Sequence, residues 1–201
     1  MTKNSGKHYS ITRLLKSFTK TDEGASPLTY GALVNQLGDQ GFGIIAIVFA
    51  LPSALPISVI PGFSFIFGLP IVFIAIQLIM ARRTLWLPKS LYEKTVDRER
   101  LKKVIKKTMP YLLFVERLLK PRWAFFSSPL MERLHGIVLL ALSLFLLLPI
   151  PFSNFIFAAI IICFGFGIAE KDGVFLVIAY IATVLYFLFL TSMVEIIKRF
   201  I

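Results

Sequence analysis

Apolar residues along this chain are gathered in long blocks, and two blocks are interrupted by uncharged turns rich in proline. The first interruption is LPSALPISVIPG at 51–62, and the second is LPIPFSN at 148–154. The residues expected to break the helices are Pro52, Pro56, Pro61, Gly62, Pro149 and Pro151. Proline removes a backbone donor and clashes with the preceding turn, and an open backbone in hydrocarbon must be satisfied by protein or trapped water. The pattern therefore predicts two re-entrant helical hairpins whose tips lie within a bilayer.

The two hairpins have a similar layout. Thirteen positions separate Gly43 from Pro56 and also Gly136 from Pro149, and a phenylalanine-rich limb follows each turn. This spacing predicts an internal repeat whose two hairpins enter from the same face. The apolar limb at 43–51 reaches only ~14 Å, about half of a ~30 Å hydrocarbon core. The returning limb at 63–80 is expected to be interrupted at Gly68 and Pro70.

Helical periodicity predicts the remaining elements. A short basic amphipathic helix is expected from Ser10, a second short helix at 28–37 ending at Gly38, and a charged helix at 97–107. The segment 174–194 contains neither proline nor charge and reaches ~32 Å, which is enough to cross a membrane. It is the predicted C-terminal transmembrane helix.

The expected fold is an all-α integral membrane protein with amphipathic basic connector helices between the two hairpins. Its polar N-terminal segment occupies 1–27, and a single membrane domain occupies 28–201. That domain divides into repeat one at 36–82, the basic connector at 83–132, repeat two at 133–172 and the C-terminal span at 173–197.

Composition supports the membrane assignment, because 57% of the residues are hydrophobic, whereas soluble domains contain about 45–50%. The net charge is +11 and is concentrated at 81–135, beside apolar segments. The positive-inside rule accounts for this placement, so nucleic acid is not an expected partner. The N-terminus and 81–135 are predicted to be cytoplasmic, with anionic lipid headgroups bound at the connector.

The side chains offer little catalytic or metal-binding chemistry. Cys163 is the single cysteine, and His8 and His135 lie far apart without ligand spacing. No nucleophile and base pair, phosphate loop or paired intramembrane carboxylates are visible. We therefore expect no cofactor, no metal and no enzymatic activity.

Small polar residues near the proline turns are the candidate site for an ion or an envelope-glycan precursor. Broken helices in transporters use such tips to bind polar groups. The candidates are Ser53, Ser58, Ser64, Gln77, Ser153 and Asn154. The alternative is that the tip residues only satisfy the broken backbone, and that Gln77 is a helix-contact residue.

Charged residues at the ends of the apolar blocks form a second set of candidates: Asp39, Arg82, Arg83, Glu170 and Asp172. Asp39 and Glu170 could form a proton or cation relay facing one cavity. The structural alternative is that Asp39 caps a helix and Glu170 pairs with a nearby cation. Arg82 and Arg83 are expected to bind lipid phosphate, with an anionic lipid-linked substrate as the alternative.

Several short motifs together resemble the ExoD family of bacterial exopolysaccharide-synthesis proteins. They are GDQGFG at 38–43, LPSALPISVIPGFS at 51–64, ARRTLWLPKSL at 81–91, LPIPFSN at 148–154 and EKDG at 170–173. The resemblance covers about residues 28–190, with Gln40 in place of a basic residue and Ser153 in place of a glycine. It implies a multi-pass protein of the bacterial inner membrane connected to exopolysaccharide production, and it brings no catalytic residues.

Two functions remain open. The first is a transporter-like protein, expected to be a homodimer, with a polar site at the hairpin tips. The alternative is a non-transporting scaffold or regulator that contacts polysaccharide-synthesis proteins through the basic connector.

Overall fold

The computed structural model describes residues 28–55, 63–82, 84–97, 99, 101–103, 105, 106, 109, 113, 118–148 and 153–200. This part of the chain is helical and contains only isolated β-bridges outside its helices, as an all-α prediction requires. The elements are α2 (Tyr30–Leu37), α3 (Gln40–Ser53), α4 (Phe63–Ile79), α5 (Lys89–Tyr92), η2 (Ala124–Ser127), α7 (Pro129–Leu147), α8 (Ser153–Glu170) and α9 (Gly173–Phe200).

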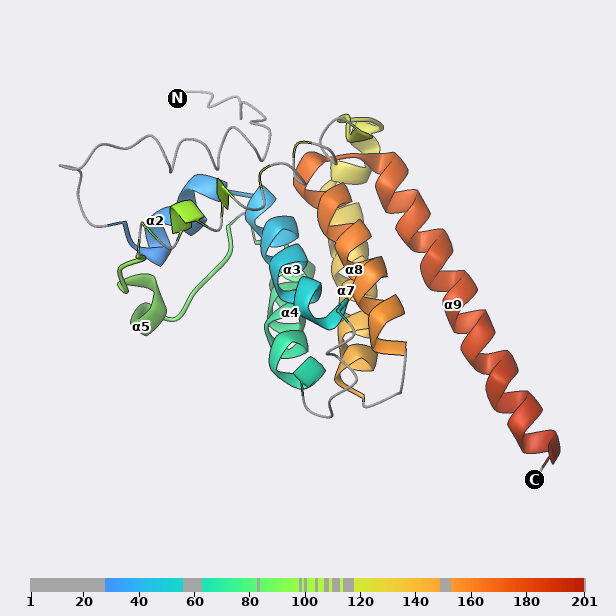
Figure 1. The fold of residues 1–201 in the computed structure, drawn as a ribbon. Coiled ribbons are helices and arrows are strands. Elements are labelled where there is room, and N and C mark those ends of the chain that lie inside the picture. Colours follow the sequence, from blue (N-terminus) through green and yellow to red (C-terminus); the bar gives the residue numbers. More distant parts are fainter. Residues whose placement is uncertain are drawn as a thin grey trace.

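Four helices form a bundle made of two antiparallel hairpins, α3 with α4 and α7 with α8 (Figure 1). The helices pack across the hairpins, α3 against α8 and α4 against α7. Both hairpins turn at the same end of the bundle, which we call the tip end; the opposite end is the mouth end. The largest fully buried core side chains include Ile71, Leu139, Leu142, Leu146, Phe157, Ile161 and Phe164.

Two glycines allow the hairpins to approach closely. A Cβ atom at Gly43 would lie 2.7 Å from the backbone nitrogen of Ala169 in α8. A Cβ atom at Gly136 would lie 2.8 Å from the backbone nitrogen of Ile79 in α4. Small residues at helix interfaces permit such contact in membranes, where packing rather than water exclusion drives association.

The returning limbs α4 and α8 end in the same way at the mouth end. Ala81 (φ 52°) and Lys171 (φ 55°) both adopt the left-handed conformation just after their helix. The next amide then bonds back into the helix, Arg82 N to the Gln77 carbonyl at 3.2 Å and Asp172 N to the Gly167 carbonyl at 3.0 Å. These bonds are those of the Schellman motif, which satisfies the last carbonyls of a helix.

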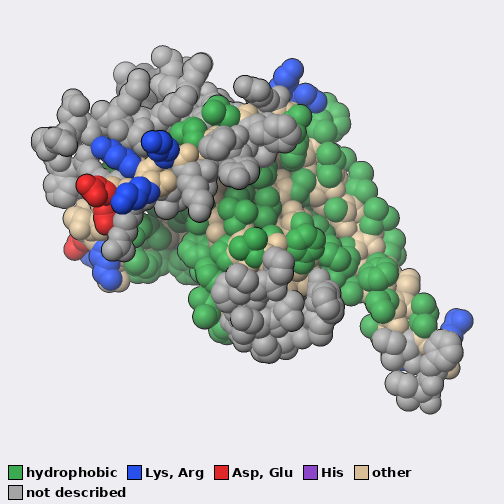
Figure 2. Space-filling view, viewed as in Figure 1, with side chains coloured by type: hydrophobic (Ala, Val, Ile, Leu, Met, Phe, Trp, Pro, Cys, Tyr) green, Lys and Arg blue, Asp and Glu red, His purple; other side chains and the backbone are tan. Residues whose placement is uncertain are grey.

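The outer surface of the bundle and α9 is apolar, as expected for a lipid-facing surface. Large side chains such as Ile66, Leu69, Leu144, Phe155 and Leu185 are exposed on it, and Figure 2 shows hydrophobic side chains covering this face. Of the described helices, α7, α8 and most of α9 are long and apolar enough to cross a membrane. α2 and α3 pass that test together but are bent by 119°, and α4 is shorter. The chain is a membrane protein.

The prediction that Pro52 breaks its helix is wrong. It lies inside the last turn of α3, which ends one residue later at Ser53. A proline this close to the end costs the helix only one backbone bond. The Ala54 amide bonds back to the Ala50 and Leu51 carbonyls, 3.1 Å from each. The chain therefore leaves the helix after Pro52 rather than at it.

The predicted interruption at Gly68 and Pro70 is also wrong, because α4 is continuous through both. Gly68 faces α7, where a Cβ atom would lie 2.9 Å from Leu147 Cδ2. Helices in membranes tolerate proline where neighbouring groups compensate for the lost bond. Gly68 thus serves helix contact and does not end the helix.

Other boundaries follow the sequence more closely. The helix expected at 28–37 is present as α2, with the Thr29 hydroxyl accepting from Ala32 N and with Gly38 at φ 56° as the C-cap. α7 begins earlier than the apolar run, at Pro129, because Ser128 provides an N-cap. Ser153 and Asn154 belong to the first turn of α8 rather than to the connecting turn. The amphipathic helix expected from Ser10 lies outside the described residues.

Candidate functional site

The tip end joins the two hairpins through a pair of buried polar side chains. Asn154, at the start of α8, donates a hydrogen bond from Nδ2 to Ser64 Oγ at the start of α4, over 2.9 Å. Both residues are buried, with exposed fractions of 8% and 4%. The bond links segments ninety positions apart. It is a direct polar contact between the tips of the two hairpins.

Ser53 supplies a third polar group to this end. It is the last residue of α3 and is fully buried. α3 runs antiparallel to α8, with Gly43 against Ala169 and Ile47 against Gly165. That register places Ser53 opposite the second turn of α8, near residue 159. Ser153, in the first turn of α8, is also buried.

Two polar atoms at the tip end have no hydrogen-bond partner among the described residues: Ser53 Oγ and Asn154 Oδ1. A buried polar group without a partner costs about 1–3 kcal/mol. The tip cluster, defined here as Ser53, Ser64, Ser153 and Asn154, therefore has hydrogen-bonding capacity left for a ligand or water.

Gln77 lies far from this cluster, near the mouth end of α4. Its Nε2 donates to the Trp86 carbonyl at 3.3 Å, and its Oε1 accepts from Trp86 N at 2.6 Å. Gln77 therefore fixes the segment that follows α4. Its predicted place in the candidate site is not supported, whereas its alternative role as a contact residue agrees with these bonds.

The boundary charges have separate positions at the mouth end. Asp39 occupies the N-cap position of α3 but makes no cap hydrogen bond; its carboxylate pairs with Lys171 Nζ at 2.7 Å. Asp172 is buried, and its carboxylate accepts from Lys120 N at 2.8 Å and from Val174 N at 2.9 Å. Asp172 therefore caps α9 and holds the preceding connector in place.

Glu170 and Arg82 complete the described boundary charges. Glu170 is buried and has an interaction partner. Arg82 is exposed, with its guanidinium 6.0 Å from the centre of the Trp86 ring. The other predicted site and turn residues lie outside the described part of the chain: Ser58, Arg83, Pro56, Pro61, Gly62, Pro149 and Pro151.

A cavity of about 650 Å³ opens at the mouth end, between the starts of α3 and α7 and the ends of α4 and α8. Its charged lining residues are Asp39, Arg82, Glu132 and Lys171. Glu132 lies within electrostatic range of Asp39 and Lys171. Within the described segments, no three His, Cys, Asp or Glu side chains are grouped to hold a metal ion.

His135 is a functional candidate that sequence reasoning missed. It is buried beside the mouth cavity, with Nδ1 2.6 Å from the Tyr180 hydroxyl and Nε2 3.0 Å from the Phe126 carbonyl. A carbonyl only accepts, so Nε2 donates to it. The helical stripe of His135, Leu139, Leu142 and Leu146 could have revealed that this histidine faces the core.

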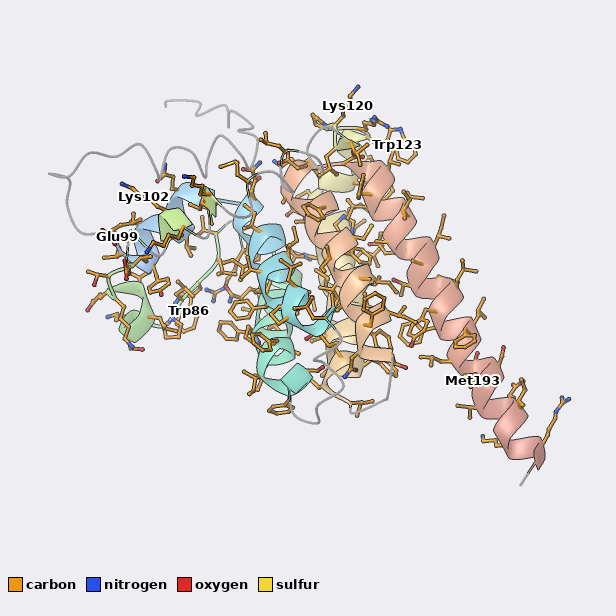
Figure 3. The ribbon with its side chains drawn as sticks, in the orientation of Figure 1. Trp86, Glu99, Lys102, Lys120, Trp123 and Met193 are labelled. Carbon is orange, nitrogen blue, oxygen red and sulfur yellow. The ribbon has the colours of Figure 1, made fainter. Side chains whose placement is uncertain are left out.

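Cationic and aromatic side chains also lie on the connector and around the bundle. Figure 3 shows Lys120 and Trp123 beside the start of α9, Trp86 beside the bundle, and Met193 far along α9. Ile105 is buried, and the neighbouring Lys102, Lys103 and Lys106 are exposed. The described basic connector therefore presents its charges to the surface, as the amphipathic pattern predicts.

Comparison with known proteins identifies relatives. The chain matches the family model described as "Exopolysaccharide synthesis, ExoD" over residues 11–192. It is 31% identical over 167 residues to Protein ExoD of Rhizobium meliloti, covering 80% of this chain and 69% of that protein. It is 38% identical over 133 residues to an uncharacterized protein of Synechocystis sp., covering 66% of this chain and 62% of that relative. No solved structure matches.

The family model therefore extends from before α2 to within α9 and includes both hairpins, the mouth cavity and the tip cluster. Together with the identity to the Rhizobium protein along most of the sequence, it confirms the resemblance carried by the short motifs. The chain belongs to the ExoD family of exopolysaccharide synthesis.

Proposed function

We propose that this chain serves exopolysaccharide synthesis as a transporter-like protein of the bacterial inner membrane, with its polar site at the tip cluster. The observation that carries the proposal is the bond from Asn154 to Ser64 between the two hairpins. Asn154 Oδ1 has no partner in the described part of the chain, and neither does Ser53 Oγ at the end of α3. Buried polar groups in a membrane helix are costly and mark substrate or ion pathways.

The depth of the first hairpin supports a re-entrant arrangement. Trp86 packs against Phe73, with ring centroids 5.9 Å apart. Tryptophan favours headgroup depth in a membrane. From Phe73 to Phe63 the helix extends ~15 Å further toward the tip, about half of a hydrocarbon core. The tip of the first hairpin would then stop inside the bilayer, whereas α9 continues past its level (Figure 1).

The two hairpins are further proposed to be a duplicated pair. Ser64, Ala75 and Ala81 precede Asn154, Gly165 and Lys171 by the same ninety positions. These pairs occupy matching places in α4 and α8: the tip bond, the glycine contact and the left-handed helix end. A bond between two equivalent positions is expected where a twofold axis passes between parallel repeats.

The proposed topology places the N-terminus and residues 81–135 in the cytoplasm, because Lys and Arg concentrate on cytoplasmic segments. α9 would then cross to the periplasm and take Lys198 and Arg199 with it. The homodimer stays a prediction.

The functional experiment replaces the unpartnered tip groups. Asn154→Ala and Ser53→Ala are each expressed at native level, and exopolysaccharide output is measured. Both should lower output severalfold, because they remove atoms proposed to contact the transported species. Ser143→Ala is the matched control, since Ser143 is equally buried but its hydroxyl bonds to the Leu140 carbonyl of its own helix at 2.9 Å.

Unchanged output in both tip variants would contradict the transporter-like proposal. The scaffold alternative predicts that outcome together with loss of output on charge reversal at Lys102 and Lys103, two exposed lysines of the connector.

A labelling experiment tests depth separately. Single cysteines replace Leu55 and Leu148, both exposed near the tips, in a Cys163→Ser background. A membrane-impermeant thiol reagent is applied from each side, with Lys120→Cys as the exposed control at the mouth end. Protection of both tip cysteines from either side is expected. Ready labelling from the periplasm would show that the hairpins span the membrane.

A further inference from the structure

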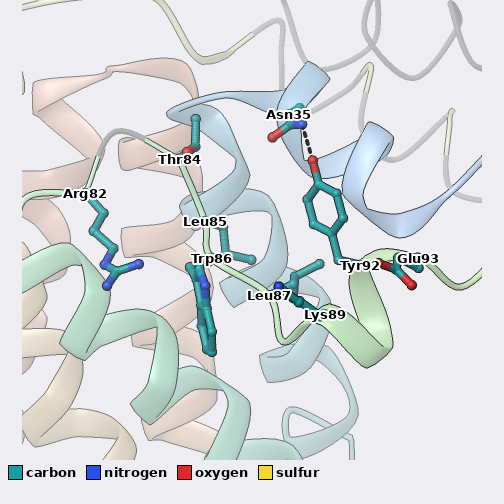
Figure 4. Close-up of a pocket in the computed structure, with 9 residues that line it drawn as sticks. All are labelled: Asn35, Arg82, Thr84, Leu85, Trp86, Leu87, Lys89, Tyr92 and Glu93. Atoms are coloured by element: carbon teal, nitrogen blue, oxygen red, sulfur yellow. Dashed lines mark hydrogen bonds between the residues drawn. The ribbon is translucent and has the colours of Figure 1, made fainter.

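A second pocket lies beside the bundle, away from the tip cluster. It has a volume of about 590 Å³ and is formed by α2, the segment at 82–89 and α5. Figure 4 shows its lining residues: Asn35, Arg82, Thr84, Leu85, Trp86, Leu87, Lys89, Tyr92 and Glu93. We call it the boundary pocket because cationic, aromatic and apolar side chains meet in it.

The walls of the boundary pocket are held by specific contacts. Gln77 makes two hydrogen bonds to the backbone of Trp86, and Asn35 Nδ2 donates to the Tyr92 hydroxyl at 2.7 Å. A Cβ atom at Gly31 would lie 2.5 Å from the Tyr92 ring, so a glycine is needed for α2 and α5 to approach. Backbone bonds from Tyr30 N to the Lys94 carbonyl and from Val96 N to the Leu28 carbonyl close the same unit. The pocket is therefore preformed.

The charge of the pocket favours an anion. Its lining contains two cations, Arg82 and Lys89, and one carboxylate, that of Glu93. Among the described residues, neither cation forms an ion pair, and the Arg82 guanidinium lies over the Trp86 ring. Arginine and lysine together are suited to phosphate, arginine through paired N–H groups and lysine as a point charge.

The surroundings favour an anion that carries hydrocarbon. Trp86 packs on Phe73, and Phe73, Ile76 and Met80 are exposed along the adjoining side of α4. Acyl or prenyl chains can lie on this apolar surface while their headgroup enters the pocket. A soluble anion would gain nothing from the same surface.

We propose that the boundary pocket binds the phosphate headgroup of an anionic membrane lipid, with Arg82 and Lys89 contacting the phosphate. This class includes the lipid phosphates on which glycan units are carried across membranes. A role of the bound lipid in exopolysaccharide synthesis rests on the proposed function, but the binding itself does not. The inference extends the general affinity of a basic surface for anionic lipid to one defined site.

The test uses Trp86 as an internal reporter. The chain has two tryptophans, so Trp123→Phe in the full-length protein leaves Trp86 alone. The protein is placed in phosphatidylcholine nanodiscs, and phosphatidic acid with brominated acyl chains is titrated in while Trp86 fluorescence is recorded. Saturable quenching is expected at low mole fractions, well beyond the quenching given by brominated phosphatidylcholine.

Variants that remove one positive charge test whether Arg82 and Lys89 contribute to lipid binding. Arg82→Gln and Lys89→Gln should each weaken the apparent affinity by about tenfold, the size expected for a hydrogen bond to a charged group. Lys120→Gln is the matched control, because it removes the same charge from an exposed lysine beside α9. Lys89 is exposed in α5, and circular dichroism of each variant checks that the helices are retained.

Two results would overturn the proposal. If Lys120→Gln weakens quenching as much as Lys89→Gln, the lipid is attracted only by overall surface charge. If soluble glycerol phosphate changes Trp86 fluorescence while brominated phosphatidic acid does not quench it, the site binds a free phosphate. Asn154→Ala should bind lipid normally even where it lowers exopolysaccharide output, so the failure of one proposal is distinguishable from that of the other.

Discussion

The two hairpins share a backbone plan and differ in the groups placed upon it. In α4 and α8 the left-handed residue, the close helix contact and the tip hydrogen bond fall at matching positions. Gly43 in α3 and Gly136 in α7 likewise contact the opposite hairpin. The two hairpins therefore have the same residues or conformations at the positions where helices pack, and their side chains differ at other positions.

The divergence is clearest at the mouth end. Gln77, which holds Trp86, corresponds to Gly167 in α8, where a Cβ atom would lie 2.7 Å from Leu176. Arg82, which lines the boundary pocket, corresponds to the buried Asp172, which caps α9. The end of the first hairpin therefore lines the boundary pocket, while the end of the second caps the last helix.

The largest effect is expected from adding a methyl group at the two close glycine contacts, which tests whether the two hairpins are equivalent in packing. Gly43→Ala and Gly136→Ala should each lower the free energy of unfolding by about 1–3 kcal/mol, because the added methyl meets backbone atoms of the facing helix. Unfolding by dodecyl sulfate in mixed micelles, followed by circular dichroism, measures both variants.

Gly41→Ala is the control for this pair. Its added methyl would meet only Leu37 Cβ, at 3.4 Å, so it should be neutral or stabilise α3 by up to about 1 kcal/mol through helix propensity. A large loss at Gly43 with none at Gly136 would mean that the hairpins are not equivalent in packing.

The second prediction concerns the positions that diverge. Asp172→Ala should cost about 1–2 kcal/mol, because it removes the cap of α9 and leaves the Lys120 and Val174 amides without their acceptor. Arg82→Ala, at the corresponding position of the first hairpin, should have little effect on the same unfolding measurement. Equal losses would show that Arg82 also has a structural function.

Much of the fold could be predicted because membrane helices are recognisable in a sequence as long apolar segments. The hairpins, the α2 boundary at Gly38 and the C-terminal span followed from that pattern. Proline was misleading at Pro52 and Pro70, because a lost backbone bond is tolerated at a helix end or where neighbouring helices support the chain. The cost of one missing bond depends on tertiary context that the sequence does not display.

The candidate site was predicted only in part for a similar reason. Asn154 and Ser64 meet because each begins the returning limb of its hairpin, which the positions of the two uncharged interruptions indicated, and Ser53 and Ser153 are buried near the same end. For Gln77 the sequence left two roles open, because its partner, the backbone of Trp86, presents no recognisable side-chain signal. His135 was missed because its partners, Tyr180 and Phe126, lie on other elements.

The third prediction concerns the strength of the hydrogen bond between Ser64 and Asn154, which joins the two hairpins. A double-mutant cycle of Ser64→Ala and Asn154→Ala should give a coupling energy of about 0.6 kcal/mol, and at most about 1.7 kcal/mol, as for other hydrogen bonds between membrane helices. Asn154→Ala alone should change stability little, since it also removes the unpartnered Oδ1. A coupling energy of zero would indicate that the tips do not meet in the membrane.

The smallest effect is expected from the ion pair that crosses the mouth end. Asp39 and Glu132 each stand four positions before the packing glycine of their hairpin. Among the ion pairs of the described residues, Lys171 is paired with Asp39 and not with Glu132, and Asp39 and Lys171 are 54% and 36% exposed. Asp39→Asn and Lys171→Gln should each cost about 0.2–1 kcal/mol, and the loss should shrink as salt is added, because exposed charges are screened. Glu132→Gln should be neutral or slightly stabilising, because it relieves repulsion with Asp39. If Glu132→Gln instead destabilises as much as Asp39→Asn, Lys171 interacts equally with the carboxylates of both hairpins. The charges at the mouth end would then be arranged as symmetrically as the hydrogen-bonded residues at the tip end.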